Sequence, residues 1–215
     1  MTKIEAILSD FLTALDAYDR EAAVHIAVDA IQKEKMDVPT LYEQILAPSL
    51  NMIASNTKNQ EIPIWDEHLR SNIVRTVIEN IFPLLSTSTA IDAKRALVLC
   101  LEEEYHDMGA RMISDYVSLL GFKTFFIGAN TPKKEIIHAV EYLAPDLICI
   151  SVTNYYHLTR LHSMVESLKN INAEPFKIVI GGYAVHNTSN VRELVEVDYY
   201  ASSFEDLLKI KEALL

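Results

Sequence analysis

Glycine is missing from the first half of this 215-residue chain. All five glycines fall between residues 109 and 182. Helices can do without glycine, whereas the tight turns between strands and helices often need its conformational freedom. The distribution therefore predicts a helical first part and a second part in which strands alternate with helices.

Long apolar runs and an excess of basic residues are also missing. No run approaches the roughly 18 apolar residues that a membrane span needs, and the first residues lack the basic-then-apolar pattern of a signal peptide. The formal net charge is −11, which repels phosphate backbones. We therefore expect a cytoplasmic protein that contacts neither a membrane nor nucleic acid directly.

Cysteine is scarce. The two residues, Cys100 and Cys149, each lie in an apolar run that resembles a strand. This placement favours buried thiols in the core over a disulfide or a metal-binding pair.

The first part is predicted to form four helices with short connections, which favours an antiparallel bundle. Thr2 begins a T-x-x-E capping box, and Asp19 can cap the second helix. Pro39 lies near the start of the third helix, where its missing N–H costs little, and Pro63 opens the fourth. Pro48 predicts a kink within the third helix.

The second part alternates apolar runs, typical of buried strands, with helical patterns. The runs are 96–101, 124–127, 147–152, 177–180 and a weaker one at 197–201; the helical stretches are 107–120, 133–143, 158–170 and 205–214. This alternation predicts a parallel sheet covered on both faces. The polar composition of segment 86–89 is typical of a linker. We therefore predict a four-helix bundle over residues 1–88, followed by a Rossmann-like (flavodoxin-like), doubly wound five-stranded parallel sheet over residues 89–215.

Three short motifs follow predicted strands, at the edge where ligands bind in such folds. The first contains Glu104 and His106. A carboxylate two residues before a histidine can accept a proton from one ring nitrogen, leaving the other to bind a metal. Gly109 would let the backbone turn closely beside a bulky group. The alternative is an acidic strand end followed by a solvated histidine.

The other two motifs are Ser151-Val152-Thr153 and Gly181-Gly182. The hydroxyl groups could bond a ligand in the crevice, or they could only satisfy loop backbone groups. The paired glycines could leave room for a flat ligand, or they could form an ordinary turn.

Together the motifs resemble the three-part signature of cobalamin-binding domains, D-x-H-x-x-G, S-x-L and G-G. Here they read E-x-H-x-x-G, S-x-T and G-G, over roughly residues 93–215. The helical part resembles the four-helix cap that precedes such domains in methionine synthase, corrinoid methyl-carrier proteins and CarH-like MerR-type regulators. The resemblance implies a bound cobalamin, either adenosylcobalamin or methylcobalamin.

The resemblance also implies a role for each matched residue. His106 would displace the cofactor's own base and coordinate cobalt as the lower ligand, and Glu104 would support His106. The remaining cofactor-binding residues of the sheet part would be Asp107, Met108, Gly109, Ser151, Thr153, Gly181 and Gly182. His157 and His186 could reach the cofactor tail or support the His106 pair.

The helical cap offers three further candidates. His68 would be a candidate upper ligand of cobalt, Glu67 would contact the upper group, and Trp65 could serve as an aromatic lid. The alternative for Trp65 and His68 is packing and solvent exposure at a helix start. Thr57 and Lys58 stand where light-sensing relatives place a tryptophan and a histidine, which argues against light-driven switching.

Two functions remain open. In the first, the protein is a non-enzymatic cobalamin sensor without its own DNA-binding segment, which signals through a protein partner or through homo-oligomers. In the second, it is a corrinoid methyl carrier that serves methyltransferases. Thr153 and the sequence Gly109-Ala110-Arg111 favour the sensor, whereas His106-Asp107-Met108-Gly109 resembles the carriers. A decayed site in a pure interaction module is a third alternative.

Overall fold

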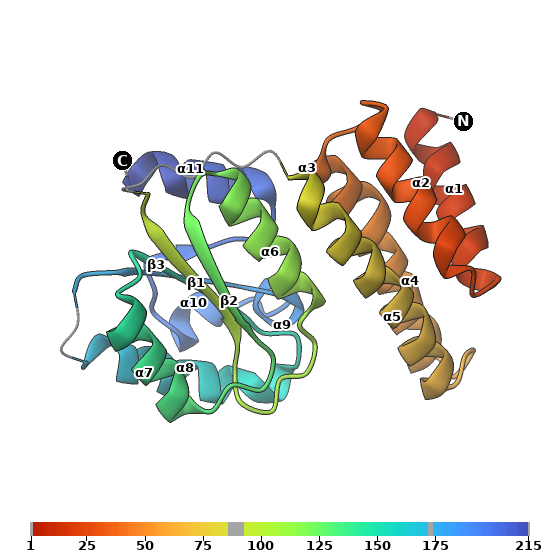
Figure 1. The fold of residues 1–215 in the computed structure, drawn as a ribbon. Coiled ribbons are helices and arrows are strands. Elements are labelled where there is room, and N and C mark those ends of the chain that lie inside the picture. Colours follow the sequence, from red (N-terminus) through yellow and green to blue (C-terminus); the bar gives the residue numbers. More distant parts are fainter. Residues whose placement is uncertain (1, 86–92, 172–173, 215) are drawn as a thin grey trace. The chain divides into compact units, whose positions relative to one another are not determined.

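The computed structural model describes residues 2–85, 93–171 and 174–214 (Figure 1). The chain divides into two compact units, residues 1–86 and residues 87–215. The predicted linker at 86–89, and with it the predicted boundary after residue 88, lies outside the described residues.

Unit 1 is helical, and its helices begin where the sequence predicts. Its elements are α1 (Lys3–Asp16), α2 (Arg20–Gln32), α3 (Val38–Leu41), a π-helical turn (Tyr42–Leu46), α4 (Ala47–Lys58), α5 (Ile64–Ile81) and a 3₁₀ turn (Phe82–Leu84). The capping box is complete, because Glu5 N–H donates to the Thr2 hydroxyl and Thr2 N–H donates to the Glu5 carboxylate. Asp19 caps α2 through Ala22 N–H. Each cap satisfies backbone donors that a helix start leaves without partners.

The kink expected at Pro48 takes the form of a π-helical turn just before the proline. Ala47 N–H donates to the Tyr42 carbonyl, five residues earlier. Proline has no N–H and its ring crowds the carbonyl four residues back, so a wider turn relieves the clash. The Ser49 hydroxyl donates to the Ile45 carbonyl at 2.7 Å and satisfies that acceptor.

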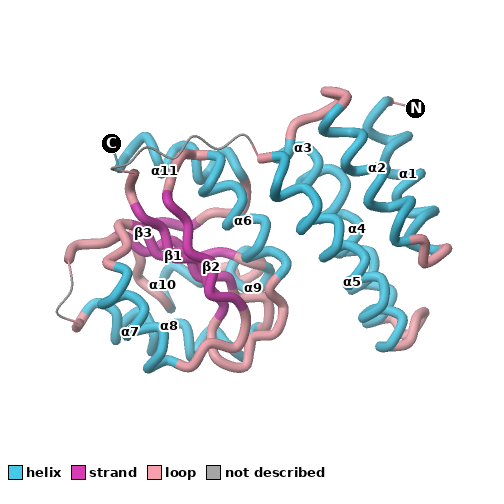
Figure 2. Tube along the Cα trace, in the orientation of Figure 1, coloured by secondary structure: helices cyan, strands magenta, loops and turns pink. Residues whose placement is uncertain are grey.

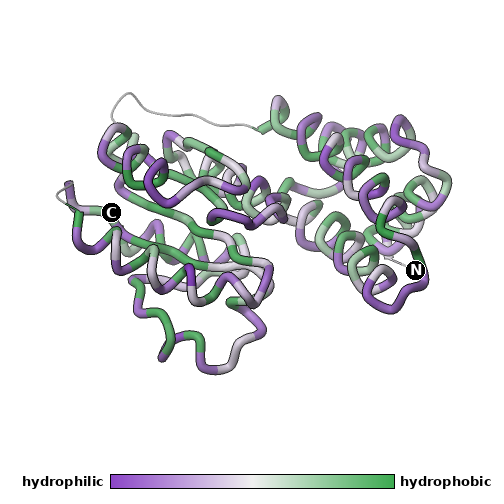
Figure 3. Tube along the Cα trace, turned by 90° about the horizontal axis from the view of Figure 1, so that it is seen from below, coloured by the Kyte–Doolittle hydropathy of each residue, from purple (hydrophilic) through white to green (hydrophobic). Residues whose placement is uncertain are grey.

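The core of unit 1 forms around α2, which packs on α1 and α5. Three alanines of α2, Ala23, Ala27 and Ala30, are fully buried. Small side chains along one stripe let the neighbouring helices approach closely. Figure 3 shows the alternation of hydrophobic and hydrophilic residues along these helices, as expected when each helix buries only one face.

Unit 2 contains the predicted five-stranded parallel sheet, in the order β2-β1-β3-β4-β5 (Figure 2). The strands are β1 (Arg95–Cys100), β2 (Lys123–Gly128), β3 (Leu147–Ser151), β4 (Lys177–Gly181) and β5 (Tyr199–Tyr200). The chain moves from β1 to β2 on one side and then returns to place β3 on the other. The loops after β1 and β3 therefore diverge at a switch point, where α/β sheets bind ligands.

Helices cover both faces of the sheet, which confirms the doubly wound prediction. The helices are α6 (Met108–Leu119), α7 (Lys133–Leu143), α8 (Leu158–Lys169), α9 (Tyr183–His186), α10 (Val191–Leu194) and α11 (Phe204–Leu214), with a 3₁₀ turn at Tyr155–His157. Figure 1 shows α6 and α11 on one side of the sheet and α7 and α8 on the other. Leu97, Leu99 and Leu101 join the α7 and α8 side chains in one core.

Cys100 and Cys149 are both buried and not disulfide-bonded, as the sequence predicts. Burial raises the pKa of each thiol to about 12. Thiols with such a high pKa stay protonated at neutral pH and act as small apolar groups of the core.

The protein's own backbone requires glycine at positions 181 and 182. A Cβ atom at Gly181 would lie 2.4 Å from the Ala201 carbonyl oxygen. Gly182 has a φ of +97°, and its Cβ would lie 2.5 Å from the Val152 carbonyl oxygen. The ordinary-turn alternative therefore accounts for both glycines, because larger residues would clash with the segment after β5 at position 181 and with the segment after β3 at position 182.

No helix among residues 2–85, 93–171 and 174–214 is both long enough and apolar enough to cross a membrane.

We predict that Gly182→Ala destabilises the protein by about 3 kcal/mol, since it combines a forbidden φ with a clash against rigid backbone. Gly121→Ala is the matched control: Gly121 also has a positive φ of +92°, but nothing lies within 4 Å of its Cβ position. It should cost only about 1 kcal/mol. Urea denaturation followed by circular dichroism measures both, and equal losses would contradict the clash.

Candidate functional site

The loop between β1 and α6 carries the central residues of the site. Glu104 N–H donates to the Leu101 carbonyl at 3.0 Å, which closes a tight turn directly after the strand. Within this turn Glu103 adopts a φ of +66°, a left-handed conformation that few non-glycine residues take. The turn directs Glu104 into the protein, where it is fully buried, and leaves His106 at the surface.

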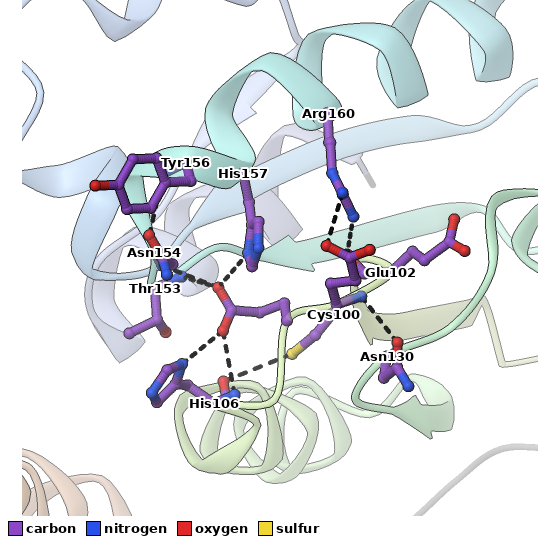
Figure 4. A network of polar contacts seen from close by, with 11 residues as sticks. Cys100, Glu102, His106, Asn130, Thr153, Asn154, Tyr156, His157 and Arg160 are labelled. Atoms are coloured by element: carbon purple, nitrogen blue, oxygen red, sulfur yellow. Dashed lines mark hydrogen bonds and ion pairs between the residues drawn. The ribbon is translucent and has the colours of Figure 1, made fainter.

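The Glu104 carboxylate accepts hydrogen bonds from five N–H groups (Figure 4). Oε1 lies 2.7 Å from His106 Nδ1 and also accepts from the His106 backbone N–H. Oε2 accepts from the backbone N–H groups of Thr153 and Asn154, at 3.0 and 2.9 Å, and lies 3.0 Å from His157 Nδ1. The carboxylate thus joins the loop after β1 to the loop after β3.

Glu104 is ionised despite its burial. Burial by itself raises the pKa of a carboxyl group. The hydrogen bonds from His106, Asn154 and His157 act in the opposite direction and prevail, so the Glu104 pKa is lowered to about 2. A carboxylate in this state can only accept hydrogen bonds, so the nitrogen that each histidine directs at it is protonated.

One face of the His106 ring contacts the protein and the rest lies at the surface. Its side chain is 64% exposed although its partner is fully buried. With the proton on Nδ1, the Nε2 atom carries the lone pair that a metal requires. A carboxylate behind the ring fixes that tautomer and strengthens the ring as a ligand.

Two residues from other segments hold the His106 loop. The Asn130 side chain accepts from Glu103 N–H at 2.8 Å, and Asn130 N–H donates to the Glu104 carbonyl at 2.9 Å. Arg160 of α8 donates to the Glu102 carbonyl and forms an ion pair with Glu103 at 2.7 Å. Asn130 follows β2 and has a φ of +50°, so the turn after β2 is shaped to meet the loop after β1.

The remaining candidates in the sheet unit differ in what their side chains contact. Asp107 is buried, and Arg111 Nε donates to its carboxylate at 3.1 Å. Met108 begins α6 and is partly exposed. Gly109 faces Ser151, because a Cβ at Gly109 would meet only the Ser151 hydroxyl, at 3.9 Å. The structure therefore brings the Glu104–Gly109 loop and the Ser151–Thr153 segment together at the carboxyl ends of β1 and β3.

Sequence reasoning missed Asn130, Asn154 and Arg160, and left His157 undecided. Each contacts the loop after β1 across 27 to 58 residues of sequence. The only local signal was their position directly after or near strand ends, which many polar loop residues share.

The cap candidates all lie in the first turns of α5. Trp65 is 62% exposed and the His68 side chain is 68% exposed. Glu67 is half-buried; its carboxylate lies 3.4 Å from His68 Nε2 and accepts from the Ser71 hydroxyl. Asp66, between them, is buried and binds Tyr18 and Arg70, which anchors this turn to the rest of the bundle.

Comparison with known proteins identifies the class. A model of the B12 binding domain matches residues 94–208, and a second B12 binding domain model matches residues 7–81. The chain belongs to the B12-binding domain family, and it is a cobalamin-binding protein.

Its relatives fall into two groups. The chain is 23% identical to the HTH-type transcriptional repressor CarA of Myxococcus xanthus, over 96% of this chain and 68% of the repressor. The chain is 22% identical to the HTH-type transcriptional repressor CarH of the same organism, over 88% of this chain and 62% of that repressor. It is also 22% identical to the dimethylamine corrinoid protein 3 of Methanosarcina acetivorans, over the full length of both chains.

The fold has a solved counterpart. The monomethylamine corrinoid protein of Methanosarcina barkeri superposes with a TM-score of 0.83 at 14% identity, covering 98% of this chain and 99% of that chain. This similarity confirms the fold, a helical unit followed by a parallel sheet.

We predict that Asn130→Gly lowers the free energy of unfolding by about 1 kcal/mol, since the variant loses the acceptor for Glu103 N–H. Asn130→Ala should lose about 2 kcal/mol, because it adds a non-glycine side chain at a left-handed φ without the asparagine's tolerance for it. Chemical denaturation measures both. An alanine variant as stable as the glycine variant would contradict the claim that the left-handed φ of residue 130 lowers the stability of the alanine variant.

Proposed function

We propose that the protein holds cobalamin with its own base displaced and His106 as the lower ligand of cobalt, and that it acts as a sensor through contacts with other proteins. The observation that carries the proposal is the pair of a fully buried, ionised Glu104 and an exposed His106. Burying a charge is costly and needs compensating contacts, which a merely solvated histidine would not require.

The residues present at this edge fit the cofactor. A corrinoid cobalt accepts a neutral imidazole, and His106 is held in the tautomer that supplies one. When bound, the cofactor supplies the cobalt centre and its chemistry, whereas the protein orients and tunes it. Glu104 contacts the histidine ring, and Asn130 and Arg160 hold the preceding residue, Glu103, through a hydrogen bond and an ion pair.

The proximity of Gly109 and Ser151 supports a further element of the proposal, a path for the displaced nucleotide tail. A Cβ at Gly109 would meet only the Ser151 hydroxyl, at 3.9 Å. Ser151 and Thr153 would donate to the tail. Gly181 and Gly182 would contribute through the turn they permit, since the approach of Val152 and Ala201 already requires them.

The helical unit supplies the proposed upper side. A B12 binding domain model covers residues 7–81, and α5 exposes Trp65 and His68 on an anchored turn. In this proposal His68 is the candidate upper ligand of cobalt, and Glu67 contacts the upper group. Thr57 donates to the Ile53 carbonyl within α4 and offers no aromatic ring, so light-driven exchange of two histidines is not part of the proposal.

The regulator is favoured over the methyl carrier by the motif after His106. In the sequence Gly109-Ala110-Arg111, the Arg111 side chain contacts other residues of the protein. Its Nε donates to the Asp107 carboxylate, and its guanidinium carbon lies 5.0 Å from the centroid of the Phe126 ring. The acidic chain suits signalling through a protein partner or a second copy of itself. The alternative is a corrinoid carrier that serves a methyltransferase. The corrinoid protein with the same fold supports it, and fold alone does not choose.

We predict that purified protein mixed with adenosylcobalamin gives a base-off, His-on absorption spectrum, and that His106→Ala loses the His-on features. His162→Ala is the matched control, because His162 is an exposed histidine of α8 outside the site. It should keep the wild-type spectrum. A wild-type spectrum identical to that of the free cofactor would refute His106 as a ligand.

A second experiment separates sensor from carrier. We expect size-exclusion chromatography to show a different assembly state for the adenosylcobalamin-loaded protein than for the cofactor-free protein, because a sensor's ligand must bind two states unequally. Methylcobalamin and hydroxocobalamin serve as comparison ligands, each run in the dark and after illumination. Identical elution in every case would remove assembly as the signal and favour the methyl carrier.

A further inference from the structure

The first turn of α5 is in contact with the turn between α1 and α2. The buried Asp66 carboxylate accepts from the Tyr18 hydroxyl at 3.2 Å and from Arg70 Nε at 2.5 Å. The Arg70 guanidinium also forms an ion pair with Asp16, and its central carbon lies 5.4 Å from the centroid of the Tyr18 ring. These contacts join segments that are 48 to 54 residues apart in the sequence.

The start of α5 differs from the starts of α1 and α2, where Thr2 and Asp19 accept hydrogen bonds from the first turn. Pro63 stands at the corresponding position of α5, and its side chain offers no acceptor. The first N–H groups of a helix have no partner within the helix, so a start without a capping side chain opens readily. Contacts from outside α5 are therefore needed to hold its first turn.

We propose that Tyr18 is a positioning residue for the upper side of the cofactor, acting through Asp66 on the first turn of α5. The inference rests on the proposed roles of Trp65 and His68. These two residues are three apart in the sequence and so are neighbours on the exposed surface of the helix. Asp66 lies between them in the same turn, and it pairs with Arg70 on the buried side of the helix. Holding the Asp66 carboxylate therefore holds the turn that carries both exposed side chains.

Among the contacts of this turn, the Tyr18 hydroxyl is the one that fixes it to the rest of the bundle. The ion pair of Asp66 with Arg70 lies within α5 and moves with the helix. The Asp16 side chain is 73% exposed, and ion pairs at the surface contribute little. Tyr18 comes from another segment and donates to a buried carboxylate, and hydrogen bonds to charged groups are stronger than those between neutral groups.

The backbone of Tyr18 is itself held on both sides. Its φ is +55°, a left-handed conformation that few non-glycine residues take. Tyr18 N–H donates to the Leu15 carbonyl at 3.1 Å, and Asp19 N–H donates to the Ala14 carbonyl at 2.8 Å. Asp19 in turn caps α2. The Tyr18 ring therefore projects from a turn that is bound to both α1 and α2, so it can hold α5 relative to them.

Two substitutions separate the two contacts of Tyr18. Tyr18→Phe removes the hydroxyl that binds Asp66 and keeps the ring beside Arg70. Tyr18→Leu removes both contacts. Thr2→Ala is the matched control for stability, because the capping box that it removes lies at the start of α1.

The first readout uses the cofactor-free protein. Hydrogen exchange followed by NMR measures opening of the first turn at the Glu67 N–H, which donates to the Pro63 carbonyl at 3.2 Å. We expect exchange about 10-fold faster in Tyr18→Phe, faster still in Tyr18→Leu, and unchanged in Thr2→Ala. Unchanged exchange in both Tyr18 variants would overturn the inference. An equal increase in Thr2→Ala would also overturn it, because Tyr18 would then act only on the stability of the bundle.

The second readout uses protein loaded with hydroxocobalamin, whose upper ligand exchanges readily. Absorption spectra report whether a histidine takes the upper position. We expect the signature of an upper histidine in the wild type and in Thr2→Ala, its loss in His68→Ala, and a reduced fraction in both Tyr18 variants. The features that depend on His106 should be the same in all these proteins, because Tyr18 and Asp66 both belong to the helical unit.

Failure of the inference and failure of the proposed function give different results. Identical spectra for the wild type and His68→Ala would refute His68 as the upper ligand, and the inference with it. A wild type that differs from His68→Ala, together with Tyr18 variants that match the wild type, would overturn the inference alone. Circular dichroism identifies any variant that does not fold. If Tyr18→Leu does not fold, Tyr18→Phe decides the outcome, because it loses a single oxygen atom.

Discussion

The buried carboxylate of Glu104 is the group on which the rest of the site depends. An ionised group without water is stable only when its hydrogen-bonding capacity is filled, and here five N–H groups fill it. These donors come from the loop after β1, the loop after β3 and the turn before α8. A change in the backbone path of one of these segments would remove hydrogen-bond donors from the buried Glu104 carboxylate. The positions of the three segments are therefore coupled.

Sheet order makes this convergence possible. β1 lies between β2 and β3, so the loop after β1 has a neighbour on each side. Asn130 holds it from the β2 side, and Thr153, Asn154 and His157 hold it from the β3 side. The close approach of Gly182 to Val152 fixes the end of β3 in turn. His106 therefore lies on backbone that is supported from both directions by contacts within the protein.

This chain is similar in sequence both to HTH-type transcriptional repressors and to corrinoid proteins. Function must then be decided by groups outside the shared scaffold. The features of this chain on which the proposed choice rests are Arg111, which contacts Asp107 and Phe126, and the exposed first turns of α5 with Trp65 and His68.

The sequence by itself determined the helix starts, the five strands, the burial of both cysteines and the Glu104–His106 spacing, because each depends on residues close together in the chain. Tertiary structure alone decided which groups complete the hydrogen bonds of the Glu104 carboxylate, since Thr153 and His157 contact it across 49 and 53 residues. It also decided why Gly181 and Gly182 are glycines: Ala201 and Val152 leave no room for a Cβ. The spacing of residues along the chain determines local geometry, whereas contacts between loops depend on the order of the strands in the sheet.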